Sequence, residues 1–330
     1  MRESEKPTPP PSARRPAAAV TLAVAAAALL TACGPRTTGA SGAAGAFATP
    51  AASAGAAPCG APLPAPAGGA QAPSGLARDG VRITAASPAC AEYEVTNPNG
   101  EPSDVTVVFN RLSAAGAALD TMTHTVAALA PGATEKRRID LSGPGPALPG
   151  AAASQVKIVK VRSVPSAEAP QPAGPCPASG LRLYADEGDA AMGLRVAGLH
   201  LRNCGTATLA LDGYPTLQLL DPEHHPVDGV RLLSGGAEIA TGTGADNPPQ
   251  KIALRPGEGA RATLVWRNTT GDGAPVNVPY VRVRATPDAA PVMVTPELDL
   301  GTTGRLGVGA WAREDAGAKP PATRPPAQGG

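Results

Sequence analysis

The sequence predicts an all-β protein with two immunoglobulin-like antiparallel β-sandwiches in tandem, a disordered N-terminal tether and a disordered C-terminal tail. First, short segments alternate apolar and polar residues, which is typical of strands that are buried on one face. Second, turns rich in Gly, Pro and Asn separate these segments at short intervals. Third, no amphipathic helical stretch follows residue 32. Together these observations favour an antiparallel sandwich.

Residues 1–32 have the composition of an export signal. A polar start is followed by the pair Arg14 and Arg15, and then by an uncharged, mostly apolar run over residues 16–30. This run has the length of the apolar region of a signal peptide and is shorter than the roughly 20 residues that a membrane-spanning helix needs. The arginine pair leaves twin-arginine export open as an alternative, although Pro16 fits that pattern poorly.

The signal ends in a motif for lipid attachment. Residues 30–34, Leu-Thr-Ala-Cys-Gly, resemble the lipobox of bacterial lipoprotein precursors. The resemblance implies cleavage after Ala32 and a diacylglyceryl group on the Cys33 thiol. Acyl chains on this one residue would attach the protein stably to a lipid bilayer. We therefore expect a lipid-anchored protein on the extracellular face of the cytoplasmic membrane, with a chance cysteine after an ordinary signal as the alternative.

Composition divides the rest of the chain into two folded domains and three unstructured segments. Residues 33–74 contain almost no large apolar side chain and cannot offset the entropy cost of ordering, so we expect a flexible tether. Pro-rich segments at 166–175 and 314–330 are expected to be a linker and a disordered tail. The predicted domains are therefore 75–165 and 176–313.

The cysteine count predicts two disulfides. Without Cys33, an even set of four cysteines remains in a chain expected to reach an oxidising compartment. We predict the pairs Cys59–Cys90 and Cys176–Cys204, because each pair brackets the first strands of its domain. A bond between the two pairs would cross the Pro-rich linker and require docked domains.

In the first domain, residues 104–110 alternate Val105, Val107 and Phe109 with other residues, which predicts a strand with these three side chains inside. Residues 155–164 form a second β-branched strand, with a bulge expected where Ile158 meets Val159.

In the second domain, residues 261–267 place Leu264 and Trp266 on a face expected to be buried, which favours a core position for this tryptophan over sugar stacking. The opposite face, with Arg261 and Thr263, is expected to be wet. Residues 280–286 alternate in the same way.

A faint internal repeat indicates that the two domains share one plan. The segment Ala-Leu-Ala-Pro-Gly at 128–132 matches Ala-Leu-Arg-Pro-Gly at 253–257, and Asn-containing turns at 95–100 and 201–205 precede them. The second copy is about 19 residues longer between these motifs. The obvious insertion is the Gly-rich segment 232–250.

This insertion is the predicted partner surface. A long insertion in a compact domain is either functional or disordered, and its apolar residues would let it dock partly on the sheet. A merely tolerated excursion is the alternative. The candidate contact residues are Leu232, Glu238, Ile239, Asp246 and Asn247.

Several ordered motifs resemble one family. The Asn-x-Gly turn at 203–205, Gly-Tyr-Pro at 213–215, Pro-Gly at 256–257 and the closing Leu-x-Leu-Gly at 298–301 resemble the actinobacterial lipoproteins of domain of unknown function 4232. The resemblance covers Cys176 to Trp311. It implies an immunoglobulin-like sandwich on the outer face of a Gram-positive membrane and implies no activity. Many members have their second cysteine where this chain has Leu209, so the resemblance does not supply the disulfide pairing.

The remaining motifs do not predict catalysis, a cofactor or a metal site. Asp221 to Asp228 contains two adjacent histidines but has the pattern of a hairpin turn, and the acids at 186–189 lack the spacing of calcium loops. Ser154 and Lys157 match the Ser-x-x-Lys spacing of acyl-transfer sites only at the start of a strand, where they cannot meet.

A net charge of +1 gives no reason to expect a nucleic-acid partner. We therefore predict a non-catalytic binding or adaptor module that contacts a cell-wall component or a protein. A cell-wall hydrolytic enzyme and a purely structural spacer are the alternatives.

Overall fold

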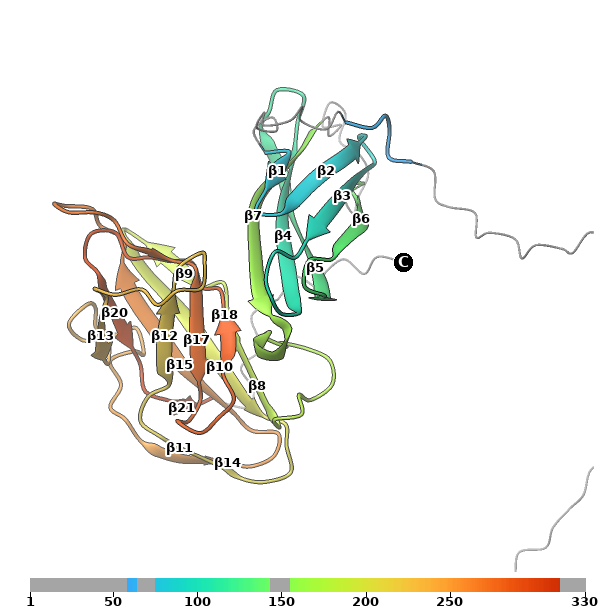
Figure 1. Cartoon of the computed structure of the whole chain (residues 1–330). Coiled ribbons are helices and arrows are strands. Elements are labelled where there is room, and N and C mark those ends of the chain that lie inside the picture. Colours follow the sequence, from blue (N-terminus) through green and yellow to red (C-terminus); the bar gives the residue numbers. More distant parts are fainter. Residues whose placement is uncertain (1–57, 64–74, 143–154, 315–330) are drawn as a thin grey trace, which may run out of the picture. The chain divides into compact units, whose positions relative to one another are not determined.

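The computed structural model of the chain describes residues 58–63, 75–142 and 155–314. The described part is all-β, with several antiparallel sheets, and it contains one short 3₁₀ helix, η1 (Ser166–Glu168), and no α-helix. The predicted export signal, Cys33 and the predicted tail after residue 314 lie outside the described residues. Figure 1 shows the strands in two groups, an N-terminal region (58–165) and a C-terminal region (176–314).

The N-terminal region contains two antiparallel sheets. The first has the order β1-β2-β3-β6, and the second has the order β5-β4-β7. Their strands are β1 (Ala77–Arg78), β2 (Val81–Ala86), β3 (Cys90–Thr96), β4 (Ser103–Leu112), β5 (Ala118–Leu129), β6 (Thr134–Asp140) and β7 (Gln155–Pro165).

The two N-terminal sheets pack face to face around one core. Val105, Val107 and Phe109 of β4 are 2%, 0% and 0% exposed, which confirms the predicted alternation. The ring of Phe109 lies 5.0 Å from that of Tyr93, a residue of the other sheet. The predicted bulge is also present, because Val108 pairs with Lys160 and Phe109 pairs with Ile158, so one residue of β7 is skipped.

The C-terminal region is built on a seven-stranded sheet with the order β13-β20-β15-β10-β8, in which β9 pairs with β10 and β21 pairs with β15. Its strands are β8 (Leu181–Ala185), β9 (Asp189–Ala191), β10 (Leu194–Asn203), β13 (Arg231–Ser234), β15 (Gly259–Arg267), β20 (Arg305–Val308) and β21 (Ala312–Arg313). Only the β13–β20 pair in this sheet is parallel.

Smaller antiparallel sheets complete the C-terminal region: β12-β17-β18, β11-β14 and β16-β19. Their strands are β11 (Leu209–Asp212), β12 (Thr216–Leu220), β14 (Lys251–Leu254), β16 (Asn277–Val278), β17 (Tyr280–Arg284), β18 (Val292–Val294) and β19 (Leu298–Asp299).

The core of the C-terminal region contains both tryptophans. Trp266 is 3% exposed and donates its indole N–H to Asp299 at 2.7 Å, while Trp311 is 1% exposed and donates to the carbonyl of Ala285 at 3.1 Å. Each ring therefore buries its apolar surface and keeps a hydrogen-bond partner. The core position of Trp266 agrees with the sequence prediction.

Both predicted disulfides are present, Cys59–Cys90 and Cys176–Cys204. Cys59 lies within the segment expected to be a tether, yet it is fully buried. Residues next to it also contact β2, since Leu63 donates its N–H to the carbonyl of Thr84 at 2.7 Å. The disulfide and this hydrogen bond together hold residues 58–63 against the sheet.

The predicted repeat appears as matching hydrogen bonds of two buried asparagines. The Asn97 side chain donates to the carbonyl of Leu129 at 2.8 Å, and the Asn203 side chain donates to the carbonyl of Leu254 at 2.8 Å. In each region the backbone carbonyl of the asparagine also accepts from the N–H of the glycine in the following Pro-Gly turn, Gly132 at 2.9 Å and Gly257 at 2.6 Å. The same connection therefore closes both regions.

We predict that Phe109→Ala lowers the free energy of unfolding by about 3–5 kcal/mol, because the substitution leaves a cavity beside Tyr93. Leu119→Ala is the matched control, since Leu119 is 38% exposed and its truncation should change stability by less than about 0.5 kcal/mol. Urea unfolding followed by circular dichroism measures both. Equal effects of the two substitutions would contradict the assigned core.

Candidate functional site

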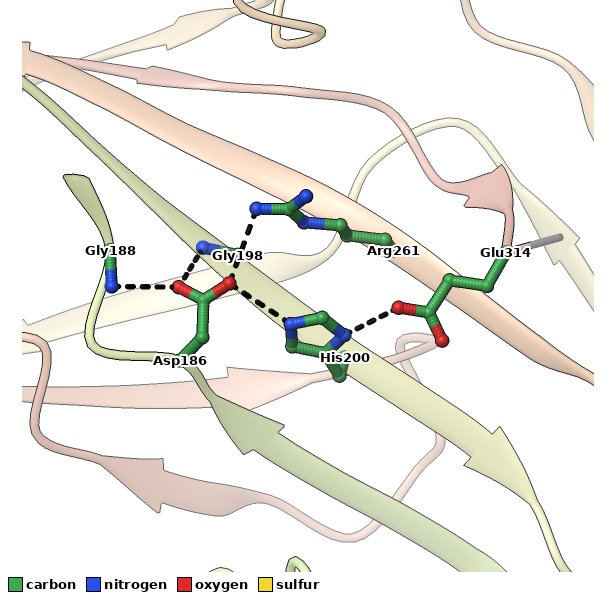
Figure 2. Close-up of polar contacts among 6 residues, drawn as sticks. All are labelled: Asp186, Gly188, Gly198, His200, Arg261 and Glu314. Atoms are coloured by element: carbon green, nitrogen blue, oxygen red, sulfur yellow. Dashed lines mark hydrogen bonds and ion pairs between the residues drawn. The ribbon is translucent and has the colours of Figure 1, made fainter. Parts of the chain in front are cut away.

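A group of four ionisable side chains lies on the seven-stranded sheet. We define the charge cluster as Asp186, His200, Arg261 and Glu314, which Figure 2 shows together. His200 of β10 is directly opposite Arg261 of β15 in the strand register. Asp186 follows β8 and Glu314 follows β21, so four separate segments supply the cluster.

Both ring nitrogens of His200 face carboxylates. Nε2 lies 3.0 Å from Asp186, and Nδ1 lies 2.5 Å from Glu314. The ring of Tyr184 stacks on the imidazole with centroids 4.9 Å apart. His200 is only 5% exposed. A carboxylate accepts hydrogen bonds, so this arrangement favours a proton on each nitrogen and a positively charged ring.

Asp186 is the most fully bonded member of the charge cluster. One carboxylate oxygen accepts from the backbone N–H groups of Gly188 at 3.0 Å and Gly198 at 2.7 Å, and the other faces His200 and accepts from Arg261 at 3.2 Å (Figure 2). A Cβ at position 198 would lie 2.4 Å from the Arg261 side chain and 2.5 Å from the Asp186 carboxylate, so one of these side chains would have to shift. Asp186 is therefore held by several independent donors.

The electrostatics agree with a charged network. Burial alone would raise the pKa of Asp186, but the hydrogen bonds from His200 and Gly198 and the charge of Arg261 outweigh it and hold that pKa below its usual value. Burial alone would lower the pKa of His200, but hydrogen bonding to Asp186 and Glu314 raises it. Both groups are therefore stabilised in their ionised forms.

The charge cluster differs from a nucleophile–base pair. In a Ser-His or Cys-His site, one histidine nitrogen must accept a proton from the nucleophile. Both nitrogens of His200 are instead engaged by carboxylates, and its ring face is covered by Tyr184. In this arrangement His200 is suited to hold two carboxylates together.

Sequence reasoning did not identify this cluster. The acids at 186–189 lack the spacing of a calcium loop and read as an acidic surface loop, but the side chain of Asp186 is only 10% exposed. His200 has no motif around it, and Glu314 was assigned to the first position of the tail. The one sequence feature that could have indicated a site is the position of His200 between Leu199 and Leu201, which places it on the outer face of an apolar strand. This position does not reveal the partners of the histidine.

The predicted insertion has a different structure from the one expected. Its first residues belong to β13, which pairs in parallel with β20. We define the insertion loop as residues 235–250. Leu232 and Leu233 were both expected to help dock this segment on the sheet. Leu233 is buried at 7% exposure, as expected, but Leu232 is 44% exposed, because adjacent residues of a strand point to opposite faces.

Small residues dock the insertion loop on the sheet, and the predicted Ile239 is half-buried. Ala245 is fully buried, and Gly236 donates its N–H to the Ala245 carbonyl at 2.8 Å. A Cβ on Gly236 would lie 2.7 Å from the side chain of Val265, and one on Gly309 would lie 2.9 Å from Ala245. The close approach therefore depends on glycine at these positions.

This docking corrects the prediction for β15. The face with Thr263 was expected to be wet, but Thr263 is 8% exposed and Val265 is fully buried. The reason is that the insertion loop lies over this face, with Gly236 against Val265. The expectation for Arg261 is correct, since 44% of its side chain is exposed.

A pocket of about 250 Å³ lies beside the insertion loop, and we call it the loop pocket. Its polar lining includes Tyr214, Ser234, Glu238, Asp246 and Asn247. Three of the five predicted contact residues therefore meet at one pocket, whereas Leu232 and Ile239 are not part of its lining.

The two carboxylates of the loop pocket, Asp246 and Glu238, have different partners. Asp246 accepts from the N–H of Gly242 at 2.9 Å, and this and neighbouring backbone N–H groups lower its pKa. Glu238 lies 3.5 Å from Arg231, with both side chains more than half exposed. Such an exposed pair contributes little energy and exchanges readily with other partners.

The His-containing motif and a second pocket have structural roles. Asp221 to Asp228 forms a hairpin turn, as predicted, in which Asp221 donates its N–H to the carbonyl of His225 at 2.9 Å. A second pocket of about 250 Å³ is lined by Arg282 and Arg284, but Arg282 is already bonded to Glu168 at 2.7 Å. Ser154 lies outside the described residues.

The fold and these sites define a disulfide-bonded, all-β class of protein with one large, loop-covered sheet. Residues 176–312 match the family model described as a domain of unknown function, DUF4232, which confirms the resemblance noted from the motifs. No curated protein and no solved structure matches the chain. Among the described residues, none belongs to a helix long and apolar enough to cross a membrane.

We predict that Asp186→Asn lowers the free energy of unfolding by about 2 kcal/mol near pH 6, because it removes charge-assisted hydrogen bonds. The contribution of Asp186, whose pKa is lowered, is present above its ordinary value of 3.8 and is lost as the pH falls. The contribution of His200, whose pKa is raised, is present below 6.5 and is lost as the pH rises through the folded value.

The stability difference should therefore be largest between about pH 4 and pH 6.5. Thermal unfolding across the pH range measures it. Asp189→Asn, which changes an exposed acid near Asp186, is the control and should have little effect. A pH-independent difference would contradict an ionised cluster.

Proposed function

We propose that this protein is a membrane-anchored extracytoplasmic lipoprotein with two immunoglobulin-like sandwiches and a non-catalytic binding or adaptor role. The lipobox-like residues around Cys33 support the anchor, and the two disulfides agree with an oxidising compartment. The antiparallel sheets that pack face to face in the N-terminal region, and the repeated asparagine connection, support two sandwiches of one plan.

The observation that most favours a binding role is the loop pocket beside the insertion loop. The loop is already docked through Ala245 and Gly236, so little ordering entropy would be lost on binding. The volume of the loop pocket, about 250 Å³, is small for a drug-sized ligand and suits one anchoring group of a larger partner.

The lining suggests the chemistry of that anchoring group. Glu238 and Asp246 supply carboxylates, Ser234 and Asn247 supply hydrogen-bonding groups, and Tyr214 supplies an aromatic ring, whereas the residues that line the pocket include no Lys or Arg. Carboxylates with an aromatic ring favour a cation. The proposed occupant is therefore a basic side chain of a protein or peptide.

The anchor has its own test. In Cys33→Ser, incorporation of radiolabelled fatty acid should be lost, and the protein should appear in the medium or remain as uncleaved precursor, because the acceptor thiol is absent. The wild-type chain labelled in the same culture is the control. Unchanged lipid labelling would refute the anchor.

The loop pocket is tested with defined probes on the soluble full chain carrying Cys33→Ser. In NMR titrations, N-acetyl-lysine methylamide should shift the backbone amides of the pocket, because its ammonium group pairs with the carboxylates. The neutral N-acetyl-norleucine methylamide should not. The double variant Glu238→Gln/Asp246→Asn should weaken the response at least tenfold.

Glu223→Gln is the matched control, since Glu223 is an exposed acid of the hairpin turn outside the pocket lining. It should leave the titration unchanged. Equal shifts with the lysine and norleucine probes, or no shift with either, would reject a cation-binding pocket.

A further inference from the structure

We propose that His200 is a pH-dependent latch for strand β21. With a proton on Nδ1, the imidazole holds Glu314 and therefore keeps β21 on the sheet. When that proton is lost, β21 is released from the sheet.

The latch follows from an asymmetry between the two carboxylates. Asp186 keeps Arg261, Gly188 and Gly198 as donors whatever the state of the histidine. Within the charge cluster the side chain of Glu314 makes one contact, which is 2.5 Å long and joins it to Nδ1 of His200 (Figure 2). Glu314 is therefore the group that depends on the proton.

The charges around the ring support this dependence. Asp186 and Glu314 contribute two negative charges, which Arg261 and a protonated His200 balance. Tyr184 stacks on the ring from β8, and Arg182 and Arg202 lie near enough to act on the Tyr184 hydroxyl. A neutral imidazole has one N–H for two carboxylates, and its bare nitrogen repels the carboxylate that it faces.

The neutral ring should keep its N–H toward Asp186, because Asp186 is fixed in place and Arg261 balances its charge. Nδ1 then presents a lone pair to Glu314. Since hydrogen bonding raises the pKa of His200 above its ordinary value, release occurs on the alkaline side of about pH 6.5.

The released element is weakly held in other respects. β21 has only two residues, both exposed, and pairs with Ala260 and Arg261 of β15. Arg313 also donates to Glu258 at 2.7 Å and to the Ala253 carbonyl at 2.6 Å, and the N–H of Glu314 donates to the carbonyl of Gly259 at 3.0 Å. Short elements with exposed hydrogen bonds open at low free-energy cost.

Opening has a structural consequence for β15. Without β21, the backbone groups of Ala260 and Arg261 lose their partners on that side. An unpaired strand end is a surface to which another strand can add. The latch therefore couples pH to exposure of a sheet edge, independently of the loop pocket.

The test uses NMR on the soluble full chain carrying Cys33→Ser, between pH 5 and pH 9.5. The ¹³Cε1 shift of His200 reports its titration. The backbone amide of Glu314 should titrate with the same midpoint, above 6.5. Its protection from hydrogen exchange, corrected for intrinsic rates, should fall at least tenfold above that midpoint.

Glu314→Gln separates the latch from a merely structural contact. The amide can accept from a protonated Nδ1 or donate to a bare one, so the protection of β21 should become independent of pH. Glu258→Gln is the matched control, because it alters a different carboxylate that holds the same strand through Arg313. This variant should lose protection at all pH values and keep the pH dependence.

Identical pH profiles for wild type and Glu314→Gln would overturn the proposal. A Glu314 amide that does not follow the His200 midpoint would overturn it as well.

Discussion

The buried asparagine at the end of the third strand of each region is the constraint on which the other features depend. Asn203 is 1% exposed, and it joins the end of β10 to the turn before β15 through both its side chain and its backbone. A buried amide without these partners would carry a large desolvation penalty, so it enforces one register. That register places Arg261 opposite His200. Asn97 makes the corresponding bonds between β3 and β6.

Strand β15 shows how one element serves three purposes. Its inner face contributes Leu264 and Trp266 to the core. The outer face is divided: the insertion loop buries Val265, whereas Arg261 joins the charge cluster. The alternating pattern of β15 predicts one solvent-exposed face, but in the folded protein much of that face is also covered. The covered part supports the loop pocket, and the charged part supports the latch.

Local pattern predicted the features that depend on neighbours in sequence. The alternation around Phe109, the bulge at Val159 and the disulfide at Cys59 were all predictable, since periodicity, β-branching and cysteine number are local or countable properties. The burial of Thr263 was not, because a strand pattern does not say which distant loop will cover it. Ala245 likewise has no apolar signal of its own, since its small size matters only beside the glycines it meets.

By itself, therefore, the sequence determined the all-β character of the described residues, the two disulfides, the repeated asparagine turn and the resemblance of residues 176–312 to one family model. The tertiary structure alone decided that Asp186, His200, Arg261 and Glu314 form one cluster. Each of these residues is ordinary in its own segment. They meet because antiparallel pairing aligns β8, β10, β15 and β21, and cross-strand register is set by long-range hydrogen bonds that no short stretch of sequence contains.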